Sequence, residues 1–237
     1  SSSDSLPRKI NTYQLLWRCN EMEETQVEKR MLLIGEEVPD FEAETTDGRI
    51  KFKDWAKGSW VILFSHPADF TPVCTTEFMA FADIYPDLKE RGVKLLGLSI
   101  DSIYSHISWI RTIKEKLGKD IPFPIIEDLS MNVAKKYGMI HPAQSATAAV
   151  RAVFFIDPNF KLRALIYYPL SNGRNMKEII RIIDAFQTSD KHSVATPANW
   201  EPGMDVIVPP PKTTADAEKR MAEGYDCADW FFCKKKL

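Results

Sequence analysis

The chain has 237 residues, of which 44% are hydrophobic and 11% aromatic, so it can bury one full core and still carry an appendage. Its formal net charge of -2 gives no reason to expect nucleic acid or an anionic membrane surface as a partner. No apolar run approaches the length needed to cross a bilayer, which predicts a soluble protein. The scattered cysteines do not suggest a disulfide scaffold and are more typical of catalytic or redox-sensing thiols; they are Cys19, Cys74, Cys227 and Cys233.

Residues 1–30 form a polar segment without a clear strand or helix pattern, and a well-patterned region begins at Met31. Basic and hydroxyl residues give this segment a faint likeness to a transit peptide, but glutamates make its second half acidic. We expect a flexible tail or a short docked helix, with a targeting segment as the alternative. Cys19 has no group of reactive residues around it.

Residues 31 to about 190 alternate strand and helix patterns. Apolar residues dominate 60–66, where Trp60 to Phe64 is uninterrupted, and 93–100, which predicts strands that are covered on both faces. The other expected strands are a short one at 50–52 opened by a turn at 46–49, a short one flanked by Pro122 and Pro124, and a pair at 153–156 and 162–168. Helices are expected from 74 to about 85, where Pro86 kinks or ends the helix, and from a cap at Asp101 or Ser102 to about 117. Two more are expected at 131–137, stopped by Gly138, and at 176–186, capped by Asn175. This order predicts an α/β domain with a mixed central sheet and helices on both sides.

Residues 191–237 differ in composition from the rest of the chain. Five of the fifteen prolines fall between 197 and 211, which predicts extended chain that cannot add to a central sheet. We expect a helix at about 214–223, followed by an aromatic triplet at 230–232 that needs a surface to cover it. A neighbouring subunit is the expected cover, so this segment is interpreted as a dimerisation arm.

The stretch Pro67-Ala68-Asp69-Phe70-Thr71-Pro72-Val73-Cys74 connects the strand at 60–66 to the next helix. A helix N-terminus carries partial positive charge and unpaired N–H groups, which favour a thiolate over a thiol. The position therefore predicts that Cys74 is a nucleophile rather than a small hydrophobic side chain of the core.

Residues 65–77, Ser-His-Pro-Ala-Asp-Phe-Thr-Pro-Val-Cys-Thr-Thr-Glu, resemble the active-site signature of peroxiredoxins. The stretches at 150–154, 168–175 and 196–200 extend the likeness to the peroxiredoxin 6 (1-Cys-type) subfamily, and within it to archaeal-type members with extra C-terminal cysteines. This resemblance implies a thioredoxin-like fold and reduction of hydrogen peroxide and organic hydroperoxides through a cysteine sulfenic acid, without cofactor or metal. It also implies homodimers, or rings of dimers such as decamers.

The roles expected at the site follow from the chemistry of peroxide reduction, in which a thiolate attacks one oxygen and the other departs. The Thr71 hydroxyl, three residues before Cys74, is placed to accept from the peroxide and donate to the thiolate. Pro67 shapes the loop and, because proline has no backbone N–H, leaves the pocket with one donor fewer. His66 either hydrogen-bonds the site or substrate, or is an ordinary core histidine.

The resemblance supplies further roles. It implies that Arg151 lies over the thiolate, whereas the sequence pattern alone favours an ordinary surface arginine at a strand end. It also implies that Glu77 and Arg174 hold the network in place, with unrelated salt bridges or solvated charges as the alternative.

Cys227 and Cys233 are separated by five residues and have no paired histidines, which argues against a zinc site. The resemblance implies instead that a tail cysteine of the partner subunit resolves the sulfenic acid as a disulfide. We expect Cys233 to be this resolving residue, with Cys227 as its helper and a thioredoxin-like protein or glutathione as the final reductant. The alternative is a one-cysteine cycle with an external thiol.

Other functions are less well supported. The phospholipase activity of some subfamily members needs a Gly-x-Ser-x-Gly elbow, but in the matching stretch at 57–61 Lys57 and Val61 stand at the two glycine positions. A disulfide oxidoreductase is disfavoured because there is no Cys-x-x-Cys. A redox-regulated chaperone or peroxide sensor is the remaining alternative. We expect a cytoplasmic location, or an organellar one if residues 1–30 act as a targeting segment.

Overall fold

The structure, a computed structural model, describes residues 31–237. The expectations for residues 1–30 and Cys19 lie outside the described residues. A seven-stranded mixed sheet of order β2-β1-β5-β4-β3-β6-β7 forms the main body. Its strands are β1 (Glu42–Thr45), β2 (Gly48–Lys51), β3 (Trp60–Ser65), β4 (Val93–Ser99), β5 (Ile125–Glu127), β6 (Arg151–Ile156) and β7 (Leu162–Tyr168). The central pairs β3–β4 and β4–β5 are parallel, whereas β6 and β7 continue the sheet antiparallel.

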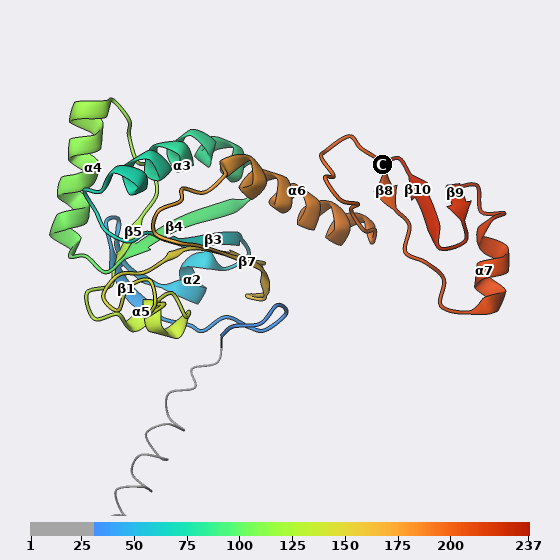
Figure 1. Ribbon diagram of the computed structural model, residues 1–237, viewed down its shortest axis with the longest axis horizontal. Helices are drawn as coiled ribbons and strands as arrows, with labels where there is room; N and C mark the ends of the chain where they lie inside the picture. The colour runs from blue at the N-terminus through green and yellow to red at the C-terminus, as the bar shows by residue number, and fades with distance from the viewer. Residues whose placement is uncertain (1–30) are drawn as a thin grey trace, which may run out of the picture.

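Helices cover both faces of this sheet (Figure 1). They are α2 (Phe52–Ala56), α3 (Pro72–Glu90), α4 (Ile103–Leu117), α5 (Asn132–Lys136) and α6 (Met176–His192). Alternate residues of β3 belong to two separate cores, Val61 and Leu63 to one, Ile62 and Phe64 to the other. The first core contains α2 and α5, and the second contains α3, α4 and α6. This arrangement is the predicted α/β fold, in which the central strand β3 is buried along its whole length.

Several helix ends agree with the expected capping. The Ser102 hydroxyl accepts from the Ser105 N–H at the start of α4, and Gly118 ends that helix with a φ of 68°. The Asn175 side chain accepts from the N–H groups of residues 177 and 178 at the start of α6.

The helix after the Cys74 loop is longer than predicted. α3 begins at Pro72 and continues through Pro86 to Glu90. A proline within a helix removes one backbone hydrogen bond, but burial of Phe81 and Leu88 on either side of it holds the helix against the sheet. α6 is also longer than predicted, since it runs to His192 and not only to residue 186.

The first hairpin was predicted in part. The expected turn connects β1 to β2, and Gly48 adopts a φ of 103° that favours glycine. The strand, however, ends at Lys51, and Phe52 begins α2. The strand expected between the two prolines at 122 and 124 instead follows them as β5, which pairs with both β4 and β1.

The C-terminal residues form a second, three-stranded sheet of order β8-β10-β9 beyond the far end of α6 (Figure 1). Its elements are β8 (Val206–Ile207), α7 (Thr214–Arg220), β9 (Asp226–Asp229) and β10 (Phe232–Lys235). Trp200 and Val206 attach the arm by packing with Ala185 of α6. The proline-rich chain stays out of the central sheet, as predicted. The domain boundaries near residues 30 and 190 stay predictions.

The expected aromatic triplet lies on the hairpin of β9 and β10, with Trp230 42%, Phe231 58% and Phe232 39% exposed. Within residues 31–237, no helix has the length and apolar character that a membrane crossing requires.

Candidate active site

Cys74 lies in the first turn of α3, two residues after the helix begins at Pro72. The side chain is completely buried, and it is the only free cysteine among the described residues. The preceding loop leaves β3 and is half-buried at Pro67, and it reaches the helix through Phe70, which has a φ of 56°. This strand-to-helix connection sets the sulfur at a helix N-terminus, as predicted, where negative charge is favoured.

Arg151, the first residue of β6, extends its guanidinium to the sulfur. Its Nη1 lies 3.2 Å from Cys74 Sγ and also donates to Glu77 Oε2 at 2.7 Å. Nε and Nη2 both donate to the Leu170 carbonyl oxygen, at 2.9 and 2.6 Å. The guanidinium is therefore fixed on both sides, with one N–H edge turned to the sulfur.

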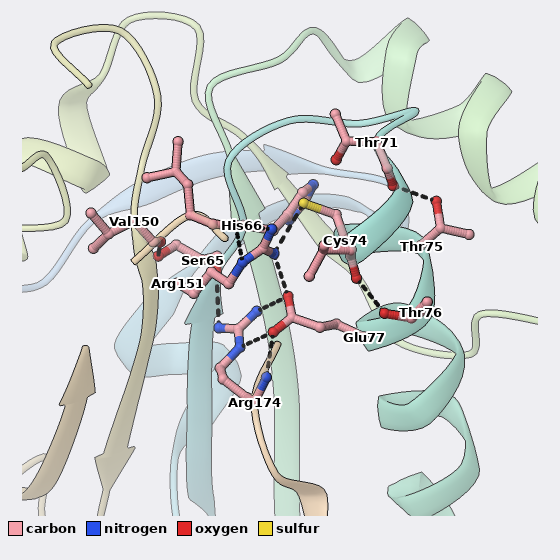
Figure 2. A network of polar contacts seen from close by, with 12 residues as sticks. Ser65, His66, Thr71, Cys74, Thr75, Thr76, Glu77, Val150, Arg151 and Arg174 are labelled. Atoms are coloured by element: carbon pink, nitrogen blue, oxygen red, sulfur yellow. Dashed lines mark hydrogen bonds and ion pairs between the residues drawn. The ribbon is translucent and has the colours of Figure 1, made fainter. Parts of the chain in front are cut away.

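Glu77 lies one turn after Cys74 on α3, and Figure 2 shows its carboxylate between Arg151 and Arg174. Arg174 donates from Nε to Oε1 at 2.8 Å and from Nη2 to Oε2 at 2.7 Å, and its backbone N–H also donates to Oε1, at 2.9 Å. Arg174 Nη1 donates to the carbonyl oxygens of Ser65 and Ala152, both at 2.8 Å. One carboxylate thus connects α3 to two strands and to the loop after β7.

The electrostatics of this cluster favour an anion at the sulfur. Burial by itself would raise the pKa of Glu77, but the hydrogen bonds and charges of Arg174 and Arg151 outweigh it, so the pKa is lowered and the group is a carboxylate. Two arginines and one carboxylate leave one unbalanced positive charge in a buried site. Because an unpaired buried charge is costly, this arrangement favours an anionic partner beside Arg151.

Thr71 differs from its expected contact. Its hydroxyl donates to the Ala68 carbonyl oxygen at 2.7 Å rather than to Cys74. The Thr71 carbonyl accepts from the N–H of Thr75, at 3.0 Å, and from its hydroxyl, at 2.7 Å. The threonine thus closes the loop onto the helix, and its hydroxyl oxygen keeps lone pairs with which to accept a hydrogen bond.

His66 is completely buried, and its Nε2 lies 2.8 Å from Asp69 Oδ1. The other oxygen of Asp69 lies 2.7 Å from Nδ1 of His106, a residue of α4. Sequence reasoning missed both partners; Asp69 lies within the motif itself, whereas nothing in the sequence marked His106.

Asp101 lies close enough to His66 and Asp69 that their ligand atoms all fall within 4.8 Å of one another. The carboxylates of this cluster are already engaged, because Asp69 binds two histidines and Asp101 Oδ2 accepts from the Ser99 hydroxyl at 2.6 Å. We therefore assign no metal to this cluster.

Ser65 is a third residue that sequence reasoning passed over. Its hydroxyl donates to the Val150 carbonyl oxygen at 2.6 Å and accepts from the Ala152 N–H at 3.2 Å, which ties the end of β3 to β6. A hydroxyl at the end of an apolar strand was the available signal.

The tail cysteines are not brought to Cys74 of the same chain. Cys227 of β9 and Cys233 of β10 form a disulfide with each other. The arm that holds them lies beyond α6 from the main sheet (Figure 1). The roles expected of Cys227 and Cys233 stay predictions.

Substitution of Glu77 by Gln tests the buried cluster. We expect a loss of about 3–5 kcal/mol in the free energy of unfolding near neutral pH, because the two arginines lose their shared anion. The folded-state pKa of Glu77 is below its ordinary value of 4.5, so its contribution is complete above that pH and declines as the pH falls through the folded-state value. Denaturant titrations of both proteins across the acid range measure this difference.

The matched control is Glu44→Gln, an exposed carboxylate that pairs with Arg49. We expect it to change stability by less than about 1 kcal/mol. An equal effect of the two substitutions at neutral pH would contradict the role given to Glu77.

The sequence matches both family models and individual known proteins. The AhpC/TSA family model matches residues 34–165, and the C-terminal domain of 1-Cys peroxiredoxin matches residues 185–224. The chain is 61% identical over 214 residues to a peroxiredoxin of Aquifex aeolicus, covering 86% of this chain and 96% of that protein. It is 56% identical over 215 residues to a peroxiredoxin of Methanosarcina mazei, covering 87% and 98%.

Solved structures agree with the sequence relatives. A yeast mitochondrial 1-Cys peroxiredoxin superposes with a TM-score of 0.78 at 44% identity, covering 87% of this chain and all of that chain (100%). A mutant of the peroxiredoxin 6 of Arenicola marina gives a TM-score of 0.77 at 39% identity, covering 87% and 99%. With the buried cysteine at a helix N-terminus and the arginine held against it, these matches show that the chain belongs to the peroxiredoxin family, the thiol peroxidases.

Proposed function

We propose that the Cys74 thiolate reduces hydrogen peroxide and organic hydroperoxides by attacking one peroxide oxygen. A sulfur–oxygen bond forms and the oxygen–oxygen bond breaks, so the sulfur is oxidised to a sulfenic acid. The second oxygen leaves as hydroxide or alkoxide and takes up a proton. The observation that carries this assignment is the contact of 3.2 Å between Arg151 Nη1 and Cys74 Sγ, in a cluster that lacks one negative charge.

The neighbouring residues have distinct roles in this proposal. Arg151 stabilises the thiolate and then the negative charge that develops on the peroxide oxygens. Glu77 and Arg174 hold Arg151 in place through the contacts described above. The Thr71 hydroxyl oxygen accepts from the peroxide, and Pro67 keeps a backbone donor out of the loop.

We further propose that Cys233 of the partner subunit resolves the sulfenic acid. Its thiolate attacks the Cys74 sulfur, the hydroxyl leaves as water, and a disulfide joins the two subunits. Cys227 of the same tail then attacks Cys233, which releases Cys74 as a thiolate and leaves the tail disulfide. The disulfide between Cys227 and Cys233 supports this last step, and the distance of the arm from the site in Figure 1 favours a tail from the partner subunit over the chain's own.

An external thiol must finally reduce the tail. The yeast mitochondrial 1-Cys peroxiredoxin resolves its thiol via glutathione/thioredoxin systems. We propose a reductant of the same class, thioredoxin-like or glutathione, for this chain. We also propose a homodimer, or a ring of dimers such as a decamer, in a cytoplasmic location, or in an organelle if residues 1–30 act as a targeting segment.

A redox-regulated chaperone or peroxide sensor is the second candidate, favoured by the exposed aromatic side chains at 230–232. It requires that oxidation change the oligomer size while peroxide turnover stays slow. Size-exclusion chromatography of reduced and oxidised protein, alongside turnover measurements, separates the two.

Replacement of Arg151 by Lys tests the charge at the sulfur. A single ammonium keeps the charge but cannot contact Cys74, Glu77 and Leu170 at once, so we expect peroxide to oxidise Cys74 about 10- to 100-fold more slowly. Stopped-flow measurement of Cys74 oxidation gives this rate. Arg49→Lys, on the exposed hairpin, is the matched control and should react like the wild type.

Replacement of the tail cysteines tests the resolving step. After full reduction and one equivalent of hydrogen peroxide, we expect Cys227→Ser to accumulate a dimer linked through Cys74 and Cys233, because the second exchange is blocked. Cys233→Ser should retain the sulfenic acid on Cys74. Non-reducing gels and intact mass identify these products. A wild type that keeps a Cys74 sulfenic acid beside a reduced tail would instead establish the one-cysteine cycle with an external thiol.

A further inference from the structure

A second group of buried ionisable side chains lies beside the arginine cluster. It consists of His66 directly after β3, Asp69 in the loop before Cys74, and His106 on α4. The two histidines are 0% exposed and Asp69 is 7% exposed. Asp69 lies between them, 2.8 Å from His66 Nε2 and 2.7 Å from His106 Nδ1. The loop that leads to Cys74 is therefore fastened to α4 through this carboxylate.

The hydrogen-bond partners determine where the protons are. His106 Nε2 lies 2.9 Å from the Ile126 carbonyl oxygen, which can only accept, so this nitrogen carries a hydrogen. Burial would raise the pKa of Asp69, but the hydrogen bonds from His106 and His66 outweigh it and hold the pKa low, so the carboxylate accepts from both rings. His106 then donates from both nitrogens, as an imidazolium.

His66 is left neutral with its hydrogen on Nε2. Burial lowers its pKa, the contact with Asp69 raises it, the charge of His106 lowers it further, and Asp101 raises it slightly. Its Nδ1 is buried and has no hydrogen-bond partner among the described residues. The ring packs against Phe78 of α3, with centroids 4.6 Å apart, and Trp109 of α4, at 5.1 Å. Nδ1 of His66 is thus a hydrogen-bond acceptor without a partner, in a ring that its neighbours hold in place. Figure 2 shows His66 among the side chains around Cys74.

We propose that His106 is a positioning residue for the peroxidase site. Its hydrogen bond to the Ile126 carbonyl oxygen holds it in place, and it in turn holds Asp69. Asp69 then holds His66 so that Nδ1, which carries no hydrogen, accepts from an O–H at the reacting centre. The oxygen that Cys74 attacks keeps its hydrogen, so the same O–H is offered first by the peroxide and then by the sulfenic acid. This inference rests on the proposed function of Cys74.

The positive charge of His106 is essential to this arrangement. Without it, Asp69 would be a buried carboxylate with His66 as its only cationic partner, which favours protonation of His66 on Nδ1. His66 would then offer a donor where the reaction needs an acceptor. Loss of His106 should therefore raise the pKa of His66, since the other charged groups around it, Asp69 and Asp101, both act in that direction.

Ring-nitrogen NMR of ¹⁵N-labelled wild type tests the proton positions without any substitution. We expect two protonated nitrogens on His106, and on His66 a protonated Nε2 with a bare Nδ1. A bare nitrogen on His106, or a hydrogen on Nδ1 of His66, would overturn the inference whether or not the protein reduces peroxide.

The variant His106→Asn keeps a donor near Asp69 but removes the charge. We expect Cys74 oxidation by hydrogen peroxide to slow about 10- to 100-fold, as for a lost hydrogen bond to a buried group, while iodoacetamide alkylates Cys74 within about twofold of the wild-type rate. The peroxide rate should recover as the pH is raised and His66 loses its extra proton.

His192→Asn, at the end of α6, is the matched control and should match the wild type in both reactions. Equal slowing of oxidation and alkylation in His106→Asn, or no recovery with pH, would show a general structural role and overturn the inference. A wild type that reduces no peroxide would overturn the proposed function and, with it, the role given to His66, while the NMR result would still report the proton positions.

Discussion

The site depends on one carboxylate, that of Glu77, shared by two buried arginines. Arg151 comes from β6 and Arg174 from the loop after β7, and both lie in the interior because Glu77 receives their hydrogen bonds. Without this anion, two like charges would be buried side by side, at a cost that apolar packing around them would not offset. The same carboxylate fixes the guanidinium that contacts the sulfur, so the stability of the interior and the reactivity of Cys74 share one contact.

The fold provides the position for that carboxylate. Cys74 and Glu77 are one turn apart on α3, so their side chains lie on the same face of the helix. That face meets the sheet because Phe78 and Phe81 of the same helix pack with Phe64 of β3. Arg174 also lies over the rings of Phe64 and Phe81, with centroid distances of 5.3 and 5.4 Å. Aromatic packing thus supports the charged cluster, and the cluster in turn fills the end of the aromatic core.

Local sequence was sufficient for the parts of the site that are themselves local. The apolar run of β3, the proline loop and the helix carrying Cys74 are contiguous, and the caps of α4 and α6 are set by single residues. What escaped prediction depends on residues far apart in the chain: α3 continues through Pro86 because distant strands bury its apolar face, and His106 meets Asp69 across 37 positions. The roles of Arg151 and Arg174 came from family resemblance alone, since strand-end arginines are ordinarily solvated.

Two neighbouring residues at the end of β3 connect the charged systems on either side of the sulfur. The Ser65 hydroxyl binds the backbone of β6, and its carbonyl oxygen accepts from Arg174. The next residue, His66, packs instead on α3 and α4 and binds Asp69. The arginine cluster carries an excess positive charge that favours an anion at Cys74, whereas the Asp69–His106 pair is neutral overall and leaves His66 uncharged. A protonated His66 would add a second positive charge beside that of Arg151 and would remove the acceptor at Nδ1. His66 therefore stays a neutral acceptor only while the charge of His106 balances that of Asp69.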